Sequence, residues 1–93
     1  MVIGVLNVIL SIYKSNSLKD KRNILNSLKT RLHRQFNISL IESDDQGKWQ
    51  KSTLTIVNIG QNKRSVDQTI NQIIDFIEKD NRCQILDHHI ELI

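Results

Sequence analysis

The segment MVIGVLNVILSI, residues 1–12, decides the fold. It is dense in Val, Ile and Leu, and it is shorter than the roughly 20 residues of a membrane-spanning helix. No positive charges precede it and no small-residue cleavage site follows, so we do not expect a signal peptide. We predict a strand buried on both faces. Successive side chains of a strand alternate, and the set expected to face the core is Val2, Gly4, Leu6, Val8, Leu10 and Ile12.

Two amphipathic helices are predicted beyond this strand. A capping box from Ser17 to Asp20 opens the first helix, which continues to about Gln35. A second capping box, from Ser65 to Gln68, opens the other helix, which ends near residue 80. Apolar residues recur at helical spacing in both: Leu18, Ile24, Leu25, Leu28, Leu32 and Phe36 in the first helix, and Val66, Ile70, Ile73, Ile74 and Ile77 in the second.

Three further strands complete the predicted pattern. They cover residues 37–43, 49–61 and 82–92, and the polar loop 44–48 joins the first two as a hairpin. The resulting order, β-α-β-β-α-β, is typical of an α+β, ferredoxin-like fold with an antiparallel sheet and both helices on one face. A length of 93 residues fits a single domain, residues 1–93.

Several classes of chemistry find no support in the residues. The one cysteine, Cys83, excludes a disulfide framework and a Cys-based zinc site, and it suits a reducing cytosol. His88 and His89 are adjacent on a predicted strand, so they point to opposite faces and cannot share a metal ion. There is no Gly-rich phosphate loop and no nucleophile elbow. We therefore expect no enzyme, no cofactor and no metal site.

Two charged features allow more than one interpretation. The acidic residues Glu42, Asp44 and Asp45 miss the calcium-loop pattern, and we expect a solvated turn there rather than an acid–base pair. Lys21 projects into the apolar arc of the first helix. Its stem either snorkels across the rim of the core or serves a partner beside the strand ends.

The charge distribution carries the most functional information. Residues 14–34 contain seven basic residues and one acidic residue, a net charge of +6, whereas the remaining chain contains six basic and nine acidic residues, a net of −3. Such a segment is either an electrostatic footprint for RNA phosphates or another acidic surface, or an ordinary solvated helix face. The candidate nucleic-acid-binding residues are Lys19, Arg22, Lys29, Arg31 and Arg34.

Two features of the predicted sheet bear on its partners. Sheets of this fold that read single-stranded RNA stack bases on aromatic residues of the central strands, but residues 2–12 and 52–60 contain none. We therefore do not expect base readout on the sheet. The outer side of the first strand presents Ile3, Val5 and Ile9. Exposed apolar side chains on a central strand favour a partner surface, and we predict a homodimer through them.

Several short motifs together resemble the YlxP-like family of small bacterial proteins of unknown function. They are the start Met1-Val2-Ile3-Gly4-Val5-Leu6, then Ser17-Leu18-Lys19-Asp20-Lys21-Arg22, Phe36-Asn37-Ile38-Ser39, Glu42-Ser43-Asp44-Asp45-Gln46 and Trp49-Gln50. The resemblance spans essentially the whole chain and implies a ferredoxin-like fold in the cytoplasm. Genes of this family often neighbour those for translation initiation and ribosome assembly, which implies a ribosomal partner. Gly47-Lys48 departs from the family pattern, where more acidic or apolar residues are usual.

Together these observations favour a non-enzymatic cytoplasmic protein that binds ribosomal RNA or a ribosome-associated partner through its basic first helix. The alternative is a dimeric regulatory module that binds a small ligand or a protein through its sheet, an expectation drawn from fold analogy alone.

Overall fold

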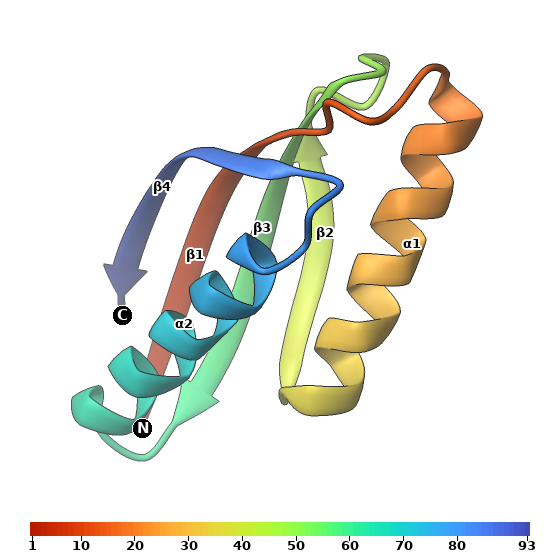
Figure 1. Cartoon of the computed structure of the whole chain (residues 1–93). Coiled ribbons are helices and arrows are strands. Elements are labelled where there is room, and N and C mark those ends of the chain that lie inside the picture. Colours follow the sequence, from red (N-terminus) through yellow and green to blue (C-terminus); the bar gives the residue numbers. More distant parts are fainter.

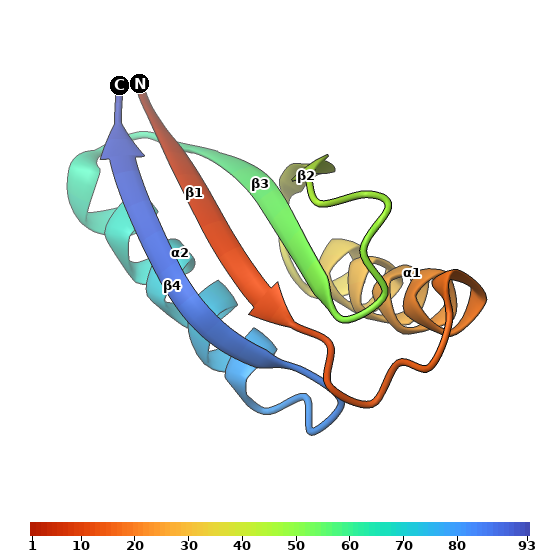
Figure 2. The same ribbon diagram turned by 90° about the horizontal axis from the view of Figure 1, so that it is seen from above.

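The computed structural model describes all residues, 1–93, and has the predicted element order. Its four strands form one antiparallel sheet in the order β2-β3-β1-β4. Both helices lie on the same face of the sheet, with α2 across β1 and α1 beside β2 (Figures 1 and 2). The elements are β1 (Val2–Ser11), α1 (Leu18–Gln35), β2 (Ile38–Asp44), β3 (Lys51–Gly60), α2 (Lys63–Glu78) and β4 (Gln84–Leu92).

The core lies between the sheet and the two helices. On β1, Leu6, Val8 and Leu10 are fully buried, which confirms that the even-numbered side chains face the helices. We call the uncovered side of the sheet the open face. Neither helix is long and apolar enough to cross a membrane. The predicted apolar stripe of α2 is buried, and that of α1 is buried except at its two ends, Leu18 and Phe36, which are half-buried. The core residues are Leu6, Val8, Leu10, Ile12, Ile24, Leu25, Leu28, Leu32, Leu54, Ile56, Val66, Ile70, Ile73, Ile74, Ile77 and Cys83.

The helix caps agree with the sequence at α1 and differ at α2. Ser17 caps α1 by accepting a hydrogen bond from the backbone N–H of Asp20, as predicted. The second predicted capping box is wrong: α2 begins one turn earlier, with Asn62 as its N-cap. The Oδ1 atom of Asn62 accepts from the N–H of Ser65 at 2.9 Å. Asn is as strong an N-cap as Ser, so the helix begins after Asn62, the earlier of the two residues.

The hairpin between β2 and β3 also begins differently from the prediction. The connection runs from residue 45 to residue 50, so β3 starts at Lys51 rather than at Trp49. The left-handed backbone conformation falls on Asp45, with φ of 64°, and not on Gly47. Asp tolerates this conformation because its short polar side chain can bond locally.

Candidate nucleic-acid interface

Helix α1 directs all five predicted nucleic-acid-binding residues outward, and four of them have no ion-pair partner within the protein. Its apolar side is buried against the sheet and α2, which directs the remaining side chains outward. Lys19, Arg22 and Arg34 are exposed and Lys29 is half-buried. These four residues form no ion pair within the chain, unlike Lys21 and Arg31 on the same helix. We refer to Lys19, Arg22, Lys29 and Arg34 as the free basic set.

Arg31 makes internal contacts instead. Its Nη1 atom lies 3.3 Å from Oδ2 of Asp80, in the loop after α2. Its guanidinium also lies over the ring of Phe76, 5.0 Å from the ring centroid. Phe76 in turn packs edge-to-face against Phe36, at a centroid distance of 5.9 Å. Arg31 thus joins α1 to α2, and Asp80 partly neutralises its charge, although the Arg31 side chain is 45% exposed.

Asp80 is a buried carboxylate that pairs with two arginines, Arg31 and Arg82. It accepts hydrogen bonds from Nε and Nη2 of Arg82, at 2.9 and 2.6 Å, and from Arg31. The bond from the Arg82 side chain holds the pKa of Asp80 below its ordinary value, although burial acts in the opposite direction. A lowered pKa means that this carboxylate stabilises the fold above its ordinary pKa and loses that contribution as the pH falls through its folded-state value.

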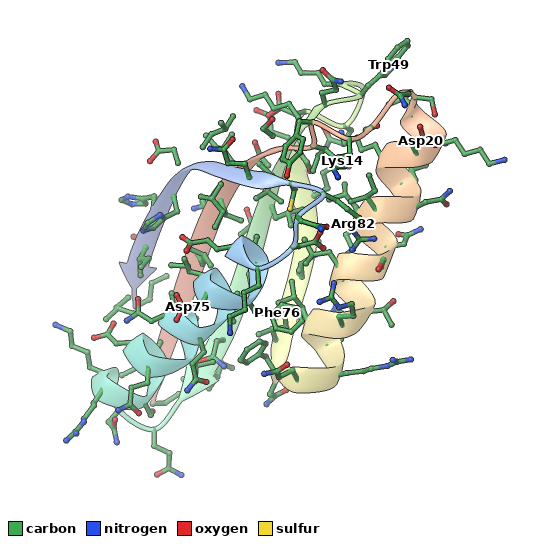
Figure 3. The ribbon with its side chains drawn as sticks, viewed as in Figure 1. Lys14, Asp20, Trp49, Asp75, Phe76 and Arg82 are labelled. Atoms are coloured by element: carbon green, nitrogen blue, oxygen red, sulfur yellow. The ribbon has the colours of Figure 1, made fainter.

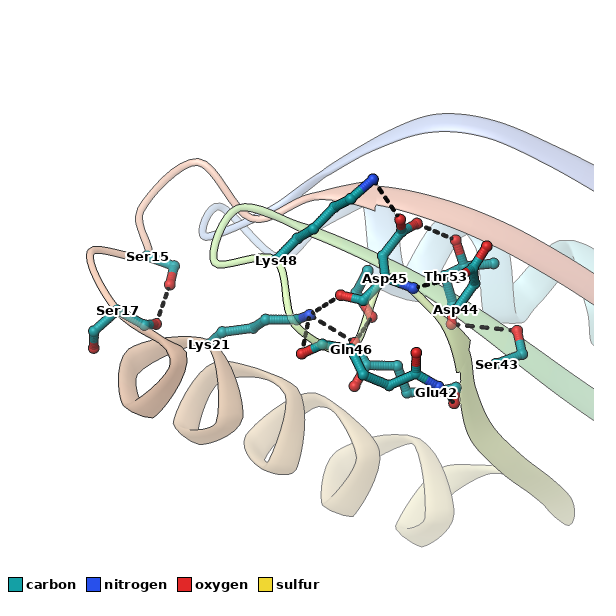
Figure 4. A network of polar contacts seen from close by, with 11 residues as sticks. Ser15, Ser17, Lys21, Glu42, Ser43, Asp44, Asp45, Gln46, Lys48 and Thr53 are labelled. Atoms are coloured by element: carbon teal, nitrogen blue, oxygen red, sulfur yellow. Dashed lines mark hydrogen bonds and ion pairs between the residues drawn. The ribbon is translucent and has the colours of Figure 1, made fainter.

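Lys21 is buried and paired, so the interpretation that its stem snorkels across the rim of the core is wrong; it has a partner beside the strand ends, and that partner belongs to this chain. Its side chain is 2% exposed, and Nζ lies 2.8 Å from Oε2 of Glu42 on β2. Nζ also donates to the carbonyl oxygens of Asp45 and Gln46, at 2.6 and 3.4 Å (Figure 4). Ser52 on β3 donates to the same Glu42 oxygen at 2.7 Å. Lys21 therefore ties the start of α1 to the end of β2 and to the hairpin.

The expectation of a solvated hairpin holds for Asp44 and for residues 46–50, which are exposed, but not for Glu42 and Asp45, which have internal partners. The carboxylate of Asp45 accepts from Oγ1 of Thr53 at 2.8 Å and pairs with Nζ of Lys48 at 2.9 Å (Figure 4). The Lys48 hydrogen bond is the main reason that the pKa of Asp45 lies below its ordinary value. One feature of the sequence indicated that the hairpin acids pair with α1, namely a lysine in the apolar arc of this helix. We call Lys21, Glu42, Asp45, Lys48 and Thr53 the hairpin clasp.

Internal pairing reduces the charge that α1 and its leading loop offer to a ligand. Of the seven basic residues in segment 14–34, Lys21 and Arg31 are paired inside the protein. Five remain against the single acid Asp20, a net of +4. At about 100° per residue, Arg22 and Lys29 lie on the flank of α1 opposite Arg31. Because Arg31 contacts α2, this flank faces away from α2.

The open face combines an apolar half and a polar half. Ile3 pairs with Ile59 and Val5 pairs with Val57 across β1 and β3. On the neighbouring strand β2, the exposed side chain of Ile41 lies opposite Thr55 and diagonal to Val57, at the border between the two halves. The structure thus places two of the predicted interface residues, Ile3 and Val5, in one apolar patch with Val57, Ile59 and Ile41.

The third predicted interface residue, Ile9, lies apart from this patch. Asn7 separates it from Val5 along β1, and its cross-strand neighbours are Thr53 and Asp87. Thr55 donates to Oδ1 of Asn7 at 2.6 Å, so polar side chains already bond to one another in this half of the face.

The histidine and cysteine positions follow the sequence reasoning. His88 pairs with the buried Val8 and His89 with Asn7 on the open face, so the two rings project to opposite sides of the sheet. Cys83 is buried in the core, and burial is the main reason that its pKa rises to about 11. A thiol with that pKa is protonated at neutral pH and is a weak nucleophile.

The topology defines an α+β protein of the ferredoxin-like class. The structure is similar to the solution structure of a de novo designed protein with a ferredoxin fold, with a TM-score of 0.51, 14% identity, and coverage of 100% of this chain and 83% of that one. The chain belongs to the family described as "Protein of unknown function (DUF503)", whose model matches residues 3–90. It is 30% identical over 67 residues to the uncharacterized protein YlxP of Bacillus subtilis (strain 168), which covers 72% of this chain and 73% of that protein.

Proposed function

We propose that this protein is a cytoplasmic, non-enzymatic RNA-binding protein that contacts ribosomal RNA, or a ribosome-associated partner, through the free basic set on α1. The observation that carries the proposal is the difference between the basic residues of one helix. Lys21 and Arg31 are paired internally, whereas Lys19, Arg22, Lys29 and Arg34 form no ion pair. The part of the proposal that names ribosomal RNA, or a ribosome-associated partner, rests on the family resemblance.

The geometry supports contacts to phosphates rather than to base edges. Lysine and arginine side chains on the outside of a helix neutralise phosphates and position a protein without reading sequence. An RNA major groove is too narrow for side-chain readout, and duplex RNA is recognised mainly by shape and backbone. We therefore expect weak sequence preference and strong salt dependence.

The test is a titration of a labelled 20-base-pair RNA duplex, followed by fluorescence anisotropy at several salt concentrations. If about four phosphates are neutralised, affinity falls roughly 10²-fold between about 50 and 200 mM salt, using the slope known for B-DNA. Arg22→Glu combined with Lys29→Glu should abolish most of this binding for every sequence tried. Surface substitutions of this kind change stability little.

A matched control makes the same change of charge elsewhere. Lys63 and Arg64 are exposed in the first turn of α2, and Lys63→Glu with Arg64→Glu should leave most of the affinity. Equal binding by the wild type and the α1 double variant would contradict the proposal. So would an equal loss in the α2 variant, because net charge alone would then explain binding.

A specific feature of the open face favours a second role, assembly with another copy of this chain. Ile41 and Ile59 are 62% and 57% exposed, and they join Ile3, Val5 and Val57 into one apolar patch. The backbone groups of β1 and β3 are already paired within the sheet, so this face cannot add an extended peptide as a strand. A flat apolar surface packs well against another sheet face. A two-fold axis would bring the same patch of each copy together.

A further inference from the structure

The indole of Trp49 is a large aromatic side chain that is exposed outside both the free basic set and the apolar patch. Trp49 is the only tryptophan of the chain, lies in the β2–β3 hairpin, and is 56% exposed. Tryptophan is highly buried on average. Figure 3 shows its ring extending away from the ribbon at the end of the molecule that also carries Lys14 and Asp20. Nothing in the fold requires this ring to stand in solvent.

The hairpin that carries Trp49 is held at both ends. The hairpin clasp fixes residues 45 and 46 to the start of α1 through Lys21. At the other end, the N–H of Ile12 donates to the carbonyl of Gln50 at 2.8 Å, and the Gln50 side chain donates to the carbonyl of Ser15 at 3.0 Å. The contacts of Lys21 and Gln50 fix the position of the hairpin tip, which displays the ring of Trp49. Burying the Lys21 charge carries a desolvation cost, which these contacts offset.

The surroundings of the ring are cationic and polar. The bond between Gln50 and Ser15 brings the hairpin beside the β1–α1 loop, which carries the exposed Lys14. Lys19, a member of the free basic set, lies in the first turn of α1, immediately after this loop. Two acids at this end have internal partners: Asp20 accepts from the N–H of Asn16, and Asp45 accepts from Thr53 and pairs with Lys48. The third, Asp44, is exposed and bonds only the adjacent backbone N–H of Asp45.

One aromatic ring among lysines and amides fits a nucleic-acid base better than a protein partner. Protein interfaces have a contiguous apolar centre from which charged residues are depleted. The neighbours of Trp49 in the tip are instead Gln46, Gly47, Lys48 and Gln50. Aromatic stacking platforms within positively charged surfaces are how proteins bind single-stranded nucleic acid without sequence preference.

We propose that Trp49 stacks on an unpaired base of RNA, with Lys14 and Lys19 contacting the adjacent phosphates. This inference rests on the proposed RNA-binding function and extends the phosphate-binding surface of α1 to the tip of the hairpin. The RNA recognised is then a duplex with an adjoining loop, bulge or single-stranded end. The duplex lies along the free basic set, and the unpaired nucleotide lies on the indole.

The experiment uses the intrinsic fluorescence of Trp49, which reports this position alone. Wild-type protein is titrated with a labelled single-stranded RNA and with a labelled 20-base-pair duplex, and binding is followed independently by anisotropy. The single strand should quench Trp49, whereas the duplex should bind with little quenching. Trp49→Ala should weaken single-strand binding by about 5- to 150-fold, the range expected for loss of one stacked base. Trp49→Phe should restore most of it, and duplex affinity should not change.

The matched control removes an equally exposed apolar side chain at the opposite edge of the sheet. Leu86 on β4 is 55% exposed, and Leu86→Ala should bind both RNAs like the wild type. Binding of the single strand without quenching, together with unchanged affinity in Trp49→Ala, would overturn this inference and leave the basic-helix proposal standing. Equal quenching by the duplex would also overturn it. Absence of anisotropy change with either RNA would instead refute the proposed function, and this inference with it.

Discussion

Lys21 shows how a single residue can join three elements of this fold. It is among the largest fully buried side chains, and its Nζ contacts Glu42 and two hairpin carbonyls. A buried ion pair contributes little net stability relative to apolar residues of similar volume, but removal of one partner leaves the other charge unpaired. The main effect of the Lys21 contacts is therefore to fix where the hairpin lies relative to α1.

We expect Lys21→Met to lower the free energy of unfolding by about 3 kcal/mol, because Glu42 and two carbonyl oxygens lose their shared donor. Urea unfolding followed by circular dichroism measures this change. Combining it with Glu42→Leu should recover part of the loss, since the whole ion pair is then replaced by apolar groups. Lys19→Met, an exposed change on the same helix, should stay within about 0.5 kcal/mol of the wild type. A Lys21→Met protein as stable as Lys19→Met would show that the clasp is not a stabilising contact.

For single residues, the sequence predicts which face of a helix a side chain occupies better than it predicts which residue that side chain pairs with. The periodicity of α1 places Lys21 on the buried side, but its partner Glu42 comes from β2, 21 residues away in the chain. Only the folded arrangement of α1 against β2 brings the two together. Arg31 is a parallel case, because the sequence placed it among phosphate-binding residues and its partner Asp80 lies beyond α2.

Among the elements, α2 packs closely against the sheet at Gly4. A Cβ atom built at Gly4 would lie 2.5 Å from Cδ1 of Ile70 and from Cγ1 of Val66. Real Cβ atoms essentially never come this close to a neighbour. The missing side chain of Gly4 therefore permits the observed distance between α2 and β1, and both α2 residues are core residues.

Gly4→Ala should therefore destabilise the protein by about 1–3 kcal/mol, the usual cost of overpacking a core. Thermal unfolding measures the loss as a lowered midpoint. Gly47 provides the control, because a Cβ atom there would meet nothing within 4 Å. Gly47→Ala should leave the midpoint close to that of the wild type. If Gly4→Ala is equally neutral, α2 can shift away from β1 at no cost, contrary to this argument.

The sequence was sufficient to predict the elements and their order because their apolar periodicity is local. The alternation in residues 1–12 and the stripe of α2 each identify their element without information from the rest of the chain. Element ends were less well predicted, as at Asn62, where two strong capping residues compete within one turn. The internal pairing of Arg31 and the position of Ile9 among polar neighbours depend on cross-element contacts, which no local pattern contains.

For the molecule as a whole, the two proposed surfaces lie on different sides. The helices cover one face of the sheet (Figure 2), and the apolar patch lies on the other, open face. A face-to-face dimer would therefore leave both α1 helices exposed, with two free basic sets per assembly. Two linked sites can raise the overall affinity for one RNA well above that of a single site. Assembly and RNA binding are then compatible, and dimer formation would strengthen binding to an RNA that spans both helices.

The homodimer prediction can be tested separately from RNA. Light scattering on the wild type should give twice the chain mass of 10.8 kDa, because pairing buries Ile3, Val5 and Ile59 on both copies. Burial of one such side chain contributes on the order of 1.5–3 kcal/mol before the cost of association. Val5→Lys places a charge in the patch, directly opposite Val57, and should shift the protein to a monomer. Ile59→Lys, at a more exposed position, should do the same with less risk to the fold.

The control for the dimer adds the same charge on the helical side. Asn71 is exposed on α2, and Asn71→Lys should keep the mass of a dimer. Circular dichroism should show the same secondary structure for all three variants, so that a change of mass reports assembly and not unfolding. A wild type that remains at 10.8 kDa at high micromolar concentration would contradict the prediction. The apolar half of the open face would then be solvent-exposed in the free protein, and RNA binding through α1 would have to operate with one basic helix per molecule.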